Sequence, residues 1–256
     1  MPTPLHYIIH MTKSQDKPLS TSIKNAIPLH IGFIADGNRR WAKSHNLPGF
    51  EGHRQGAKRV EEIAEAAFKN GVKYVSFFIF SNENWKRSKA EVSFLMTLVR
   101  LNLTRLAKKC QKNDIRVVFM GREKPAPANL IKKFQQIEEE TKNNQSGTIC
   151  ICFNYGGQWE IADATTKIIA DINNGKLSKE TAITPEIFAK YLYHPEVPPC
   201  DLIVRTSGEI RISGYQLWRA SYSEFLFLDK NFPDLTAKDV PIIIEKYQKR
   251  KRNFGK

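Results

Sequence analysis

The sequence predicts an α/β fold with a mainly parallel sheet flanked by helices. Six short apolar runs, rich in β-branched and aromatic residues, alternate with longer helical patterns along the 256 residues. Several of these runs are almost entirely apolar, as strands are when both faces of a parallel sheet are covered. Strands that alternate with helices in this way favour one sheet with right-handed crossovers.

The expected elements follow one another in a regular order. We expect strands at 30–35, 73–80, 115–120, 148–153, 201–206 and 224–228. We expect helices at 55–69, 89–112, 127–143, 158–174, 184–193 and 238–251. In the first of these helices the apolar residues fall on one stripe, and Gly71 follows it as a C-terminal glycine often does. Ligands of open α/β sheets bind beyond the carboxyl ends of the strands, so polar side chains at those ends are the candidate site.

The first 25 residues are polar and contain several prolines. We therefore expect a flexible N-terminal extension at 1–25 and a single domain at 26–256. The four cysteines have no zinc-like spacing and are expected to be buried, reduced thiols. Such thiols favour a reducing compartment, so a cytoplasmic location is predicted. No stretch approaches the roughly 20 apolar residues that span a bilayer.

The formal net charge of +14 predicts an anionic partner. Nucleic acid, a phosphorylated small molecule and an acidic membrane surface all fit this charge, and charge alone does not choose among them. The basic tail at 246–256 leaves two interpretations open. It is either a solvated helix end or a contact with anionic lipid or nucleic acid.

The most informative segment is FIADGNRRWAK at 33–43. An apolar run ends on Asp36, a glycine turn follows, and Arg39 and Arg40 come next. A carboxylate can hold Mg²⁺, the turn exposes backbone N–H groups, and arginines bind phosphate oxygens in a planar fork. Asp36 could instead cap a helix, and His53 could be a structural histidine rather than a phosphate ligand. Cations gathered around one carboxylate favour a ligand that brings further negative charge.

Polar residues also follow the second predicted strand. The segment FSNENWKR at 80–87 is either a plain loop with a half-buried tryptophan or a mobile lid. As a lid, its Asn84 and Arg87 would complete the site when substrate binds.

A second basic cluster, RTSGEIRIS, occupies residues 205–213. It is either a charged surface loop or a second phosphate site, in which arginine, serine and backbone N–H groups surround a glycine. Further along, Glu224 opens an apolar strand and is either solvated or a second metal ligand. Two anion sites in one domain indicate two phosphorylated substrates, or one substrate with two phosphate groups.

Several familiar motifs are missing. The sequence contains no P-loop, GxGxxG turn, DDxxD-like box, nucleophile elbow or HExxH motif, and no covalent mechanism is indicated.

Taken together, the motifs resemble the cis-prenyltransferase family, whose bacterial members are undecaprenyl diphosphate synthases. They run from about residue 29 to 235 and read HIGFIADGNRRWAK, GHRQGAKRV, FSNENWKRSKAEVSFLM, FNYGGQWEI, and DLIVRTSGEIRISGYQLWRASYSEFLF followed by FPD. The resemblance implies an enzyme that condenses isopentenyl diphosphate repeatedly onto an allylic diphosphate such as farnesyl diphosphate, with Mg²⁺. Each new double bond would be cis, and the product would be undecaprenyl diphosphate, the lipid carrier precursor for cell-wall glycan synthesis.

The resemblance also implies a wider architecture. It implies a six-stranded sheet with a hydrophobic tunnel, within one cis-prenyltransferase catalytic domain at 26–256. We expect the strand at 148–153 and the helix at 89–106 to line that tunnel. A homodimer is implied as well, with peripheral contact to an anionic membrane and no nucleic-acid partner.

Residue roles follow from the same resemblance. Catalysis falls to Asp36 and Asn84, and Asp36 and Glu224 hold the metal. The substrate-binding residues it implies are Gly37, Asn38, Arg39, Arg40, Trp41, His53, Ser81, Trp85, Arg87, Arg205, Arg211 and Ser213. The last three of these would hold isopentenyl diphosphate.

The chain departs from the common bacterial pattern at four positions. Arg39 stands where a small residue is common, and Gly49 stands where many members have an arginine that contacts the allylic diphosphate. Arg39 is the candidate to replace that arginine. Ile210 stands where many members have a histidine near the metal, and Ile79 takes a tunnel-facing position often held by a smaller residue. Product length is therefore left open.

Two other functions compete with the enzyme. A non-catalytic family subunit would lack the carboxylate and much of the first motif, whereas Asp36, Arg40, Arg205 and Arg211 are all present. A nucleic-acid-binding protein would show strongly salt-dependent binding but gives no reason for the paired anion motifs.

Overall fold

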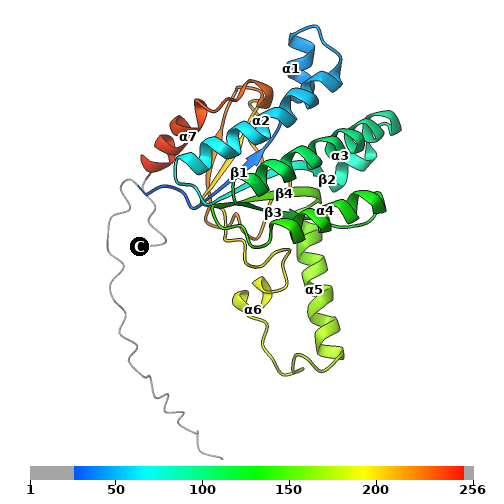
Figure 1. The fold of residues 1–256 in the computed structure, drawn as a ribbon. Coiled ribbons are helices and arrows are strands. Elements are labelled where there is room, and N and C mark those ends of the chain that lie inside the picture. The colour runs from blue at the N-terminus through cyan, green and yellow to red at the C-terminus, as the bar shows by residue number, and fades with distance from the viewer. Residues whose placement is uncertain (1–25, 251–256) are drawn as a thin grey trace, which may run out of the picture.

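Six strands form one sheet at the centre of the molecule (Figure 1). The computed structural model describes residues 26–250, so the expected extension at 1–25 and residues 251–256 of the basic tail lie outside the described residues. The strands are β1 (His30–Ile34), β2 (Tyr74–Ser81), β3 (Ile115–Met120), β4 (Gly147–Tyr155), β5 (Leu202–Arg205) and β6 (Glu224–Phe227). Their order across the sheet is β3-β4-β2-β1-β5-β6, and each of these pairings is parallel. The predicted fold class is confirmed.

Helices connect the strands and differ from expectation mainly at their ends. They are α1 (Asn38–Ser44), α2 (Gly49–Lys69), α3 (Lys89–Lys112), α4 (Ala128–Thr141), α5 (Gly157–Asn173), α6 (Pro185–Ala189) and α7 (Asp239–Gln248), with short 3₁₀ helices η1 (Asn82–Lys86) and η2 (Phe232–Asp234). The sequence pattern did not predict α1, because a seven-residue helix is too short to show a clear apolar period. None of the helices within residues 26–250 is long and apolar enough to cross a bilayer.

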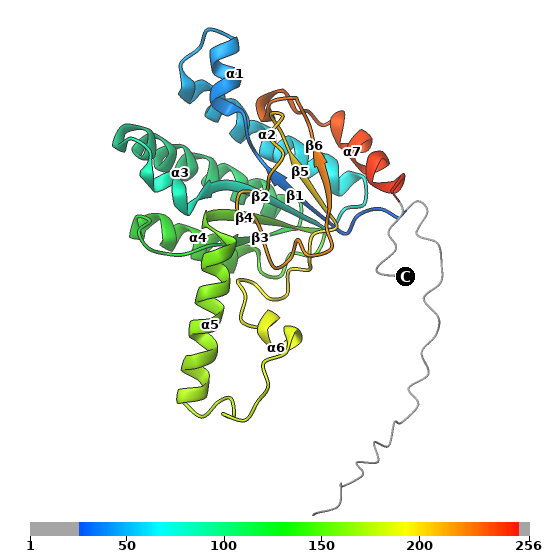
Figure 2. The ribbon, with the colours of Figure 1, turned by 180° about the vertical axis from the view of Figure 1, so that it is seen from behind.

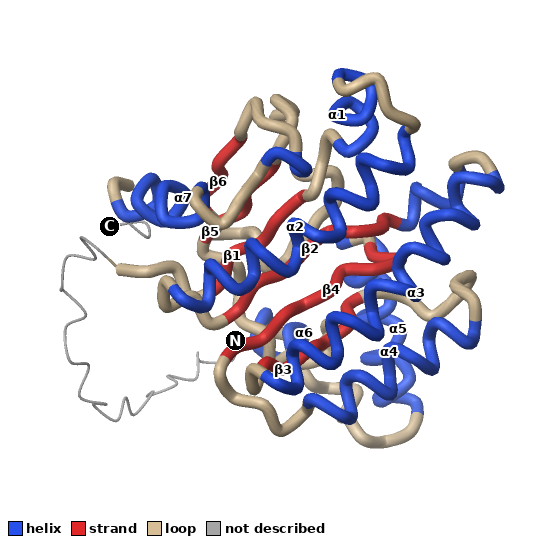
Figure 3. The backbone as a smooth tube through the Cα atoms, turned by 45° about the horizontal axis from the view of Figure 1, so that its top comes forward, coloured by secondary structure: helices blue, strands red, loops and turns tan. Residues whose placement is uncertain are grey.

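Each face of the sheet carries its own apolar core. Helices α2, α3 and α4 lie across one face, with α7 beside α2 (Figures 1 and 3). On the other side, α5 and α6 extend from the sheet (Figure 2). The first core includes Phe33 and Phe77, and the second includes Ile34, Ile203 and Tyr215. All five residues of β1 are buried, which explains why its sequence is almost continuously apolar.

The chain changes direction across the sheet at β1 and β5. Strand β1 leads through α1 and α2 to β2 on one side, whereas β5 leads to β6 on the other. Neighbouring connections that diverge leave a crevice beyond the carboxyl ends of the two strands, and ligands of open α/β sheets bind there. The register pairs Ile34 with Arg205, so Asp36 and Arg205 meet at this crevice.

Candidate active site

A cleft of about 1170 Å³ opens beyond the carboxyl ends of β1, β2 and β5. It brings together most of the residues predicted from the sequence. Those that line it are Asp36, Gly37, Asn38, Arg39, Arg40, His53, Ser81, Asn84, Arg87, Arg205 and Ser213. Segments more than 120 residues apart in sequence therefore share one cleft. The sequence predicted this, because each segment follows the carboxyl end of an expected strand.

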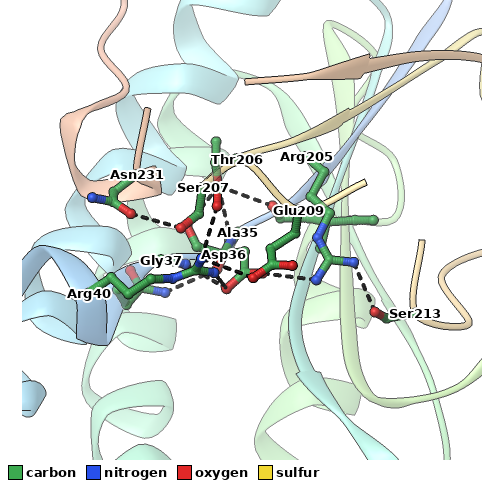
Figure 4. Close-up of polar contacts among 12 residues, drawn as sticks. Ala35, Asp36, Gly37, Arg40, Arg205, Thr206, Ser207, Glu209, Ser213 and Asn231 are labelled. Carbon is green, nitrogen blue, oxygen red and sulfur yellow. Dashed lines mark hydrogen bonds and ion pairs between the residues drawn. The ribbon is translucent and has the colours of Figure 1, made fainter. Parts of the chain in front are cut away.

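Asp36 is held between two arginines at the floor of this cleft (Figure 4). Its Oδ2 accepts a hydrogen bond from Nη2 of Arg205 at 2.9 Å, and its Oδ1 lies 3.3 Å from Nη2 of Arg40. Burial works against the charged carboxylate. The hydrogen bonds from Arg205 and from the N–H of Gly37, together with both arginine charges, outweigh burial and hold the pKa of Asp36 below its ordinary value. Asp36 is therefore an anion at neutral pH.

The backbone around Asp36 is fixed by Thr206, which sequence reasoning missed. The Asp36 N–H donates to Oγ1 of Thr206 at 3.0 Å, and that hydroxyl donates to the Asp36 carbonyl at 2.7 Å. A threonine at the end of a predicted strand gave little local signal for this role. The two hydrogen bonds clamp the segment after β1 to the segment after β5.

Gly37 has to be glycine for two reasons. Its φ of 93° lies in the left-handed region, where a residue with a side chain would be strained. A Cβ there would lie 2.3 Å from Oδ1 of Asn231 and 2.6 Å from Oγ of Ser207. Gly37 is the N-cap of α1, so the alternative that Asp36 caps this helix is not what the structure shows.

Arg205 is almost completely buried and connects both predicted motifs. Besides Asp36, its guanidinium donates to Oγ of Ser213 at 2.8 Å and to the carbonyl of Arg211. Its Nε has no hydrogen-bond partner among the described residues. A buried guanidinium with a donor left over fits a site in which a ligand supplies further acceptors.

The other buried polar atoms without a hydrogen-bond partner within residues 26–250 include Oδ1 of Asn38 and Nε2 of His53. Burial first, and then the charge of Arg87, lowers the pKa of His53 to about 4. The imidazole is therefore neutral and can donate or accept one hydrogen bond. Both side chains line the cleft, and their open hydrogen-bonding positions again point to a ligand.

Glu91 lies close to two arginines and to His53. Its carboxylate lies 3.0 Å from Nη1 of Arg87, 3.8 Å from Nη1 of Arg39 and 4.0 Å from Nε2 of His53. Sequence reasoning gave this glutamate no role. Its position in the first turn of α3, three residues after the N-cap Ser88, shows only a helix-start signal.

The segment after β2 forms η1. Ser81 and Asn84 make a capping box in which the Ser81 N–H donates to Oδ1 of Asn84 at 3.1 Å. Trp85 turns away from the cleft and donates from Nε1 to Oδ1 of Asn154 at 2.7 Å. Its ring packs edge-on against Phe80. Trp85 is half-buried, as the plainer interpretation expected, and it does not line the cleft. Its substrate contact stays a prediction.

Two further predicted substrate residues do not line the cleft. Trp41 donates from Nε1 to Oδ1 of Asp234 at 2.7 Å, and its ring stacks on His45. Arg211 is largely exposed and pairs with Glu209, which also accepts a hydrogen bond from Arg40 at 2.9 Å. These side chains support the cleft from outside it.

Glu224 lies at the wrong end of the sheet for a metal shared with Asp36. In the register of β5 and β6, Glu224 pairs with Leu202 and lies three positions before the level of Arg205. Asp36 lies two positions beyond that level, so about 16 Å of strand separates them at ~3.3 Å per residue. Glu224 pairs instead with Arg250 at 2.6 Å. The prediction that Asp36 and Glu224 hold one ion is not met within a single chain, because Glu224 opens its strand whereas the cleft lies beyond the carboxyl ends.

The cleft fits a metal that arrives with a diphosphate rather than a metal held by protein alone. Within the described part of the chain no three carboxylate, histidine or cysteine groups gather into a ligand set. Mg²⁺ commonly binds through one or two carboxylates, with substrate phosphates and water completing the octahedron. Asp36 would supply that carboxylate, with the surrounding arginines left for the phosphate oxygens.

An apolar cavity of about 110 Å³ continues from the cleft between α2, α3 and the sheet. Cleft and cavity share Ala35, Asn38, His53, Ile79 and Leu95. The cavity wall includes Leu98, Val99 and Leu103 of α3, and Ile151 of β4. These are the two segments expected to line a tunnel, although Ile151 is the single lining residue from 148–153. The full-length tunnel stays a prediction.

Further cleft residues carried no clear signal in the sequence. They are Lys43, Leu47, Glu83, Gln158, Gly214 and Leu217. Lys43 lies one turn after Arg39 on α1, which was not expected as a helix, so its place in the cleft could not be read from spacing.

Fold and site together define a class of protein. A cationic cleft around one carboxylate, at the switch point of a parallel sheet and continuous with an apolar cavity, suits a molecule with a diphosphate head and a hydrocarbon tail. Comparisons with known proteins identify the class more closely. Residues 34–255 match the family model described as "Putative undecaprenyl diphosphate synthase".

Individual relatives agree with the family match. An isoprenyl transferase of Thermotoga maritima is 44% identical over 229 residues, 90% of this chain and 97% of that protein. A trans,polycis-polyprenyl diphosphate synthase of Thermobifida fusca, specific for (2Z,6E)-farnesyl diphosphate, is 41% identical over 91% of this chain and 82% of its own. The crystal structure of lavandulyl diphosphate synthase from Lavandula x intermedia, in complex with dimethylallyl diphosphate, superposes with a TM-score of 0.82 at 31% identity. It covers 90% of this chain and 99% of that one. The chain belongs to the undecaprenyl diphosphate synthase family of isoprenyl transferases.

Proposed function

We propose that this chain condenses isopentenyl diphosphate repeatedly onto farnesyl diphosphate and so makes a long cis-polyprenyl diphosphate. The proposed product is undecaprenyl diphosphate, the lipid carrier precursor for cell-wall glycan synthesis. The observation that carries the proposal is the Asp36–Arg205 pair at the floor of a cationic cleft that opens onto an apolar cavity.

The first motif and the neighbouring helix are proposed to hold the allylic diphosphate. Arg39, Arg40 and the backbone after Asp36 would bind its oxygens, and the open Nε2 of His53 would donate one hydrogen bond to them. Asn38 is proposed to line the same site, where its Oδ1 can only accept. A Cβ at Gly49 would be in ordinary van der Waals contact with Arg39, 3.8 Å from its Cγ. This proximity supports the proposal that Arg39 supplies the cation that an arginine at 49 would otherwise give.

The second diphosphate is assigned to the loop after β5. Arg205 and Ser213 line the cleft and would bind isopentenyl diphosphate, and Arg211 would have to leave Glu209 to reach it. Ser81, Asn84 and Arg87 lie on the facing wall, where Asn84 is the proposed catalytic partner of Asp36. Holding two substrates in line is itself a large part of such catalysis.

The proposed reaction requires stabilisation of the negative charge on the leaving diphosphate, and an apolar cavity for the growing hydrocarbon chain. The allylic C–O bond breaks as diphosphate leaves, the isopentenyl double bond forms the new C–C bond to the allylic carbon, and a proton is lost. When bound by Asp36 and the diphosphate, Mg²⁺ would supply Lewis-acid stabilisation of the leaving oxygens. The arginines of the cleft offset the charge that develops there. Each five-carbon unit buried in the apolar cavity would stabilise the intermediate by about 4 kcal/mol, at ~0.8 kcal/mol per methylene.

The proposal extends to assembly and location. We expect a homodimer in the cytoplasm, in contact with an anionic membrane surface through the basic C-terminal tail, and no nucleic-acid partner. The net charge of +14 supports an anionic partner, and the family resemblance supports the homodimer. Light scattering of the purified protein, and flotation with vesicles that contain or lack anionic lipid, would test it.

The enzymatic proposal is tested by incubating the full chain with Mg²⁺, farnesyl diphosphate and labelled isopentenyl diphosphate. We expect a ladder of polyprenyl products on thin-layer chromatography, and its upper limit gives the product length. No polyprenyl product, with or without detergent, would refute the proposal.

A further inference from the structure

A buried polar cluster lies outside the cleft, on the sheet face opposite α2, α3 and α4. It joins His30 of β1, Ser76 of β2, Cys200, and Tyr215 and Gln216 from the segment between β5 and β6. All five are buried, and every one except Cys200 is completely inaccessible to solvent. None of them lines the cleft. Buried polar groups are costly unless paired, so the geometry of this cluster is informative.

The hydrogen bonds of the cluster run in one direction. Nδ1 of His30 lies 2.8 Å from the Pro198 carbonyl, which can only accept, so Nδ1 carries the proton. Burial lowers the pKa of His30 to about 4, so the ring is neutral and its Nε2 must accept. Ser76 therefore donates to Nε2 at 2.8 Å, and the Tyr215 hydroxyl in turn donates to Oγ of Ser76 at 2.6 Å.

Gln216 and Cys200 complete the cluster. The side-chain amide of Gln216 donates to Oγ of Ser76 at 3.1 Å, and its carbonyl accepts from the Cys200 thiol at 3.0 Å. Each side-chain donor in the chain from Cys200 to His30 thus reaches an acceptor. The cluster specifies one conformation of residues 215 and 216, because any other would leave buried groups unpaired.

The first strand is shaped to admit Tyr215. A Cβ on Gly32 would lie 2.9 Å from both Cε1 and the hydroxyl of Tyr215, and 3.1 Å from Sγ of Cys200. On its other side, the ring stacks on Phe78 with centroids 5.1 Å apart. Gly32 and His30 both precede the Asp36 motif on β1. Gly32 leaves room for the Tyr215 ring, and His30 joins the hydrogen-bond chain that ends at Tyr215, so neither residue serves the cleft.

The segment held by this cluster is part of the cleft wall. Ser213 and Gly214 line the cleft, and Oγ of Ser213 accepts from Arg205. Ser213, Gly214 and Gln216 all have positive φ, at 51°, 77° and 44°. For Ser213 and Gln216 such backbone is unfavourable and persists only where surrounding contacts impose it. Part of this restraint comes from the loop itself, because Arg205 donates to Ser213 and to the Arg211 carbonyl, and the Gly157 N–H donates to the Gly214 carbonyl. The buried hydrogen bonds of Tyr215 and Gln216 hold the C-terminal end of the same segment.

We propose that the hydrogen-bond chain Tyr215–Ser76–His30 is a positioning device that holds residues 211–214 in the conformation that binds the second diphosphate. These three side chains act through the loop and touch no substrate. Loosening them lowers the fraction of molecules with a competent loop, and apparent affinity falls by that fraction. The binding part of this inference rests on the proposed function, whereas the loop-ordering part does not.

The test uses Tyr215→Phe, which removes one hydroxyl and keeps the ring stacked on Phe78. Tyr191→Phe is the matched control, since the Tyr191 hydroxyl donates to Asp171 at 3.0 Å between α5 and the segment after α6. We measure hydrogen exchange of the backbone amides at 206–214 by mass spectrometry. Loss of one net hydrogen bond should speed exchange there roughly five- to tenfold in Tyr215→Phe and not in the control. Equal exchange in the two variants would overturn the proposal.

Steady-state kinetics supply the second measurement. We expect Tyr215→Phe to raise KM for isopentenyl diphosphate roughly fivefold, while kcat and KM for the allylic diphosphate change less than twofold. A merely structural role would lower Tm without this split, and a parallel rise of both KM values would contradict the proposal. The double variant Ser76→Ala/Tyr215→Phe should raise KM for isopentenyl diphosphate no more than the more severe single variant does. Additive increases in this KM would contradict a shared hydrogen-bond chain. If the wild type makes no polyprenyl product, the proposed function fails, and the exchange experiment still decides this inference.

Discussion

Asp36 and Arg205 lie 169 positions apart in the sequence, and their side chains meet at 2.9 Å between Oδ2 and Nη2. The register that pairs Ile34 with Arg205 brings the two strand ends together, and Thr206 fastens them. A nearly buried guanidinium thereby holds a carboxylate that faces the cleft. The contact joins the two basic motifs into one site, and the arrangement of charge in the cleft depends on it.

Arg205→Lys should weaken this site although it keeps the charge. A lysine cannot reach Asp36, Ser213 and the Arg211 carbonyl together, so acceptors are left unpaired. We expect kcat/KM for isopentenyl diphosphate to fall about 100-fold and the free energy of unfolding to fall by about 1–3 kcal/mol. Steady-state assays and urea unfolding measure the two effects.

Arg250→Lys is the control for that variant. Arg250 pairs with Glu224 at 2.6 Å and with the Phe225 carbonyl at 2.7 Å, at the other end of the sheet. Its kcat/KM should stay within twofold of wild type. A comparable loss of activity in both variants would speak against a specific role for Arg205, and would reopen the corrected role of Glu224.

Leu95→Trp should shorten the product. Leu95 is nearly buried and lines both the cleft and the apolar cavity, so a larger ring there narrows the passage between them. Leu101→Trp on the same helix is the control, because Leu101 is 65% exposed. Product ladders on thin-layer chromatography report the lengths. Unchanged length with Leu95→Trp would show that the growing chain runs elsewhere.

Mg²⁺ should bind only together with a diphosphate. EDTA should abolish turnover and added Mg²⁺ restore it, because one carboxylate alone makes a weak site. In thermal unfolding, Mg²⁺ alone should leave Tm unchanged, while Mg²⁺ with inorganic pyrophosphate at 100 times its Kd should add about 2.7 kcal/mol of stability. A similar rise in Tm with Mg²⁺ alone would indicate an all-protein metal site instead.

His53 should make the protein less stable in mild acid. Its pKa is about 4 in the folded state against 6.5 ordinarily, so the unfolded chain takes up the proton first as pH falls. Stability from this group is complete above pH 6.5 and is lost between pH 6.5 and 4, by roughly 3 kcal/mol. His30 contributes in the same direction.

The variant His53→Gln isolates that contribution. Glutamine does not titrate, so the free energy of unfolding from urea titrations should fall less steeply between pH 6.5 and 4 than in wild type. The difference in slope should approach one proton. Parallel profiles for the two proteins would mean that His53 is not held neutral by the fold.

Much of the fold could be predicted because strands that are buried on both faces of the sheet have almost continuously apolar sequences. Strand β1 is buried throughout and reads as an apolar run that ends just before Asp36. Helix α1 escaped because it is short and begins at once after that turn, with Arg39 and Arg40 in its first turn. Its cap is the left-handed Gly37, which looks in sequence like any turn glycine.

The site was predictable where residues follow the carboxyl end of a strand, and not where packing sets the direction of a side chain. Asp36, Asn84 and Arg205 follow that rule. Trp85 points away because Asn154 offers its indole N–H an acceptor, a contact across 69 positions that no local pattern shows. Glu224 was misplaced because it opens its strand rather than ending it. Thr206 acts on the backbone of Asp36, and Glu91 acts on Arg87. Only the tertiary structure brings these partners together.

The most direct test of the account is the turnover of Asp36→Asn, which keeps the shape of the side chain and removes its charge. With Mg²⁺, farnesyl diphosphate and labelled isopentenyl diphosphate, we expect incorporation to fall at least 100-fold. The circular dichroism spectrum should be unchanged, with a lower Tm because the buried Arg205 loses its charged partner. Near-normal incorporation by a folded Asp36→Asn protein would contradict the claim that this carboxylate organises the diphosphate site.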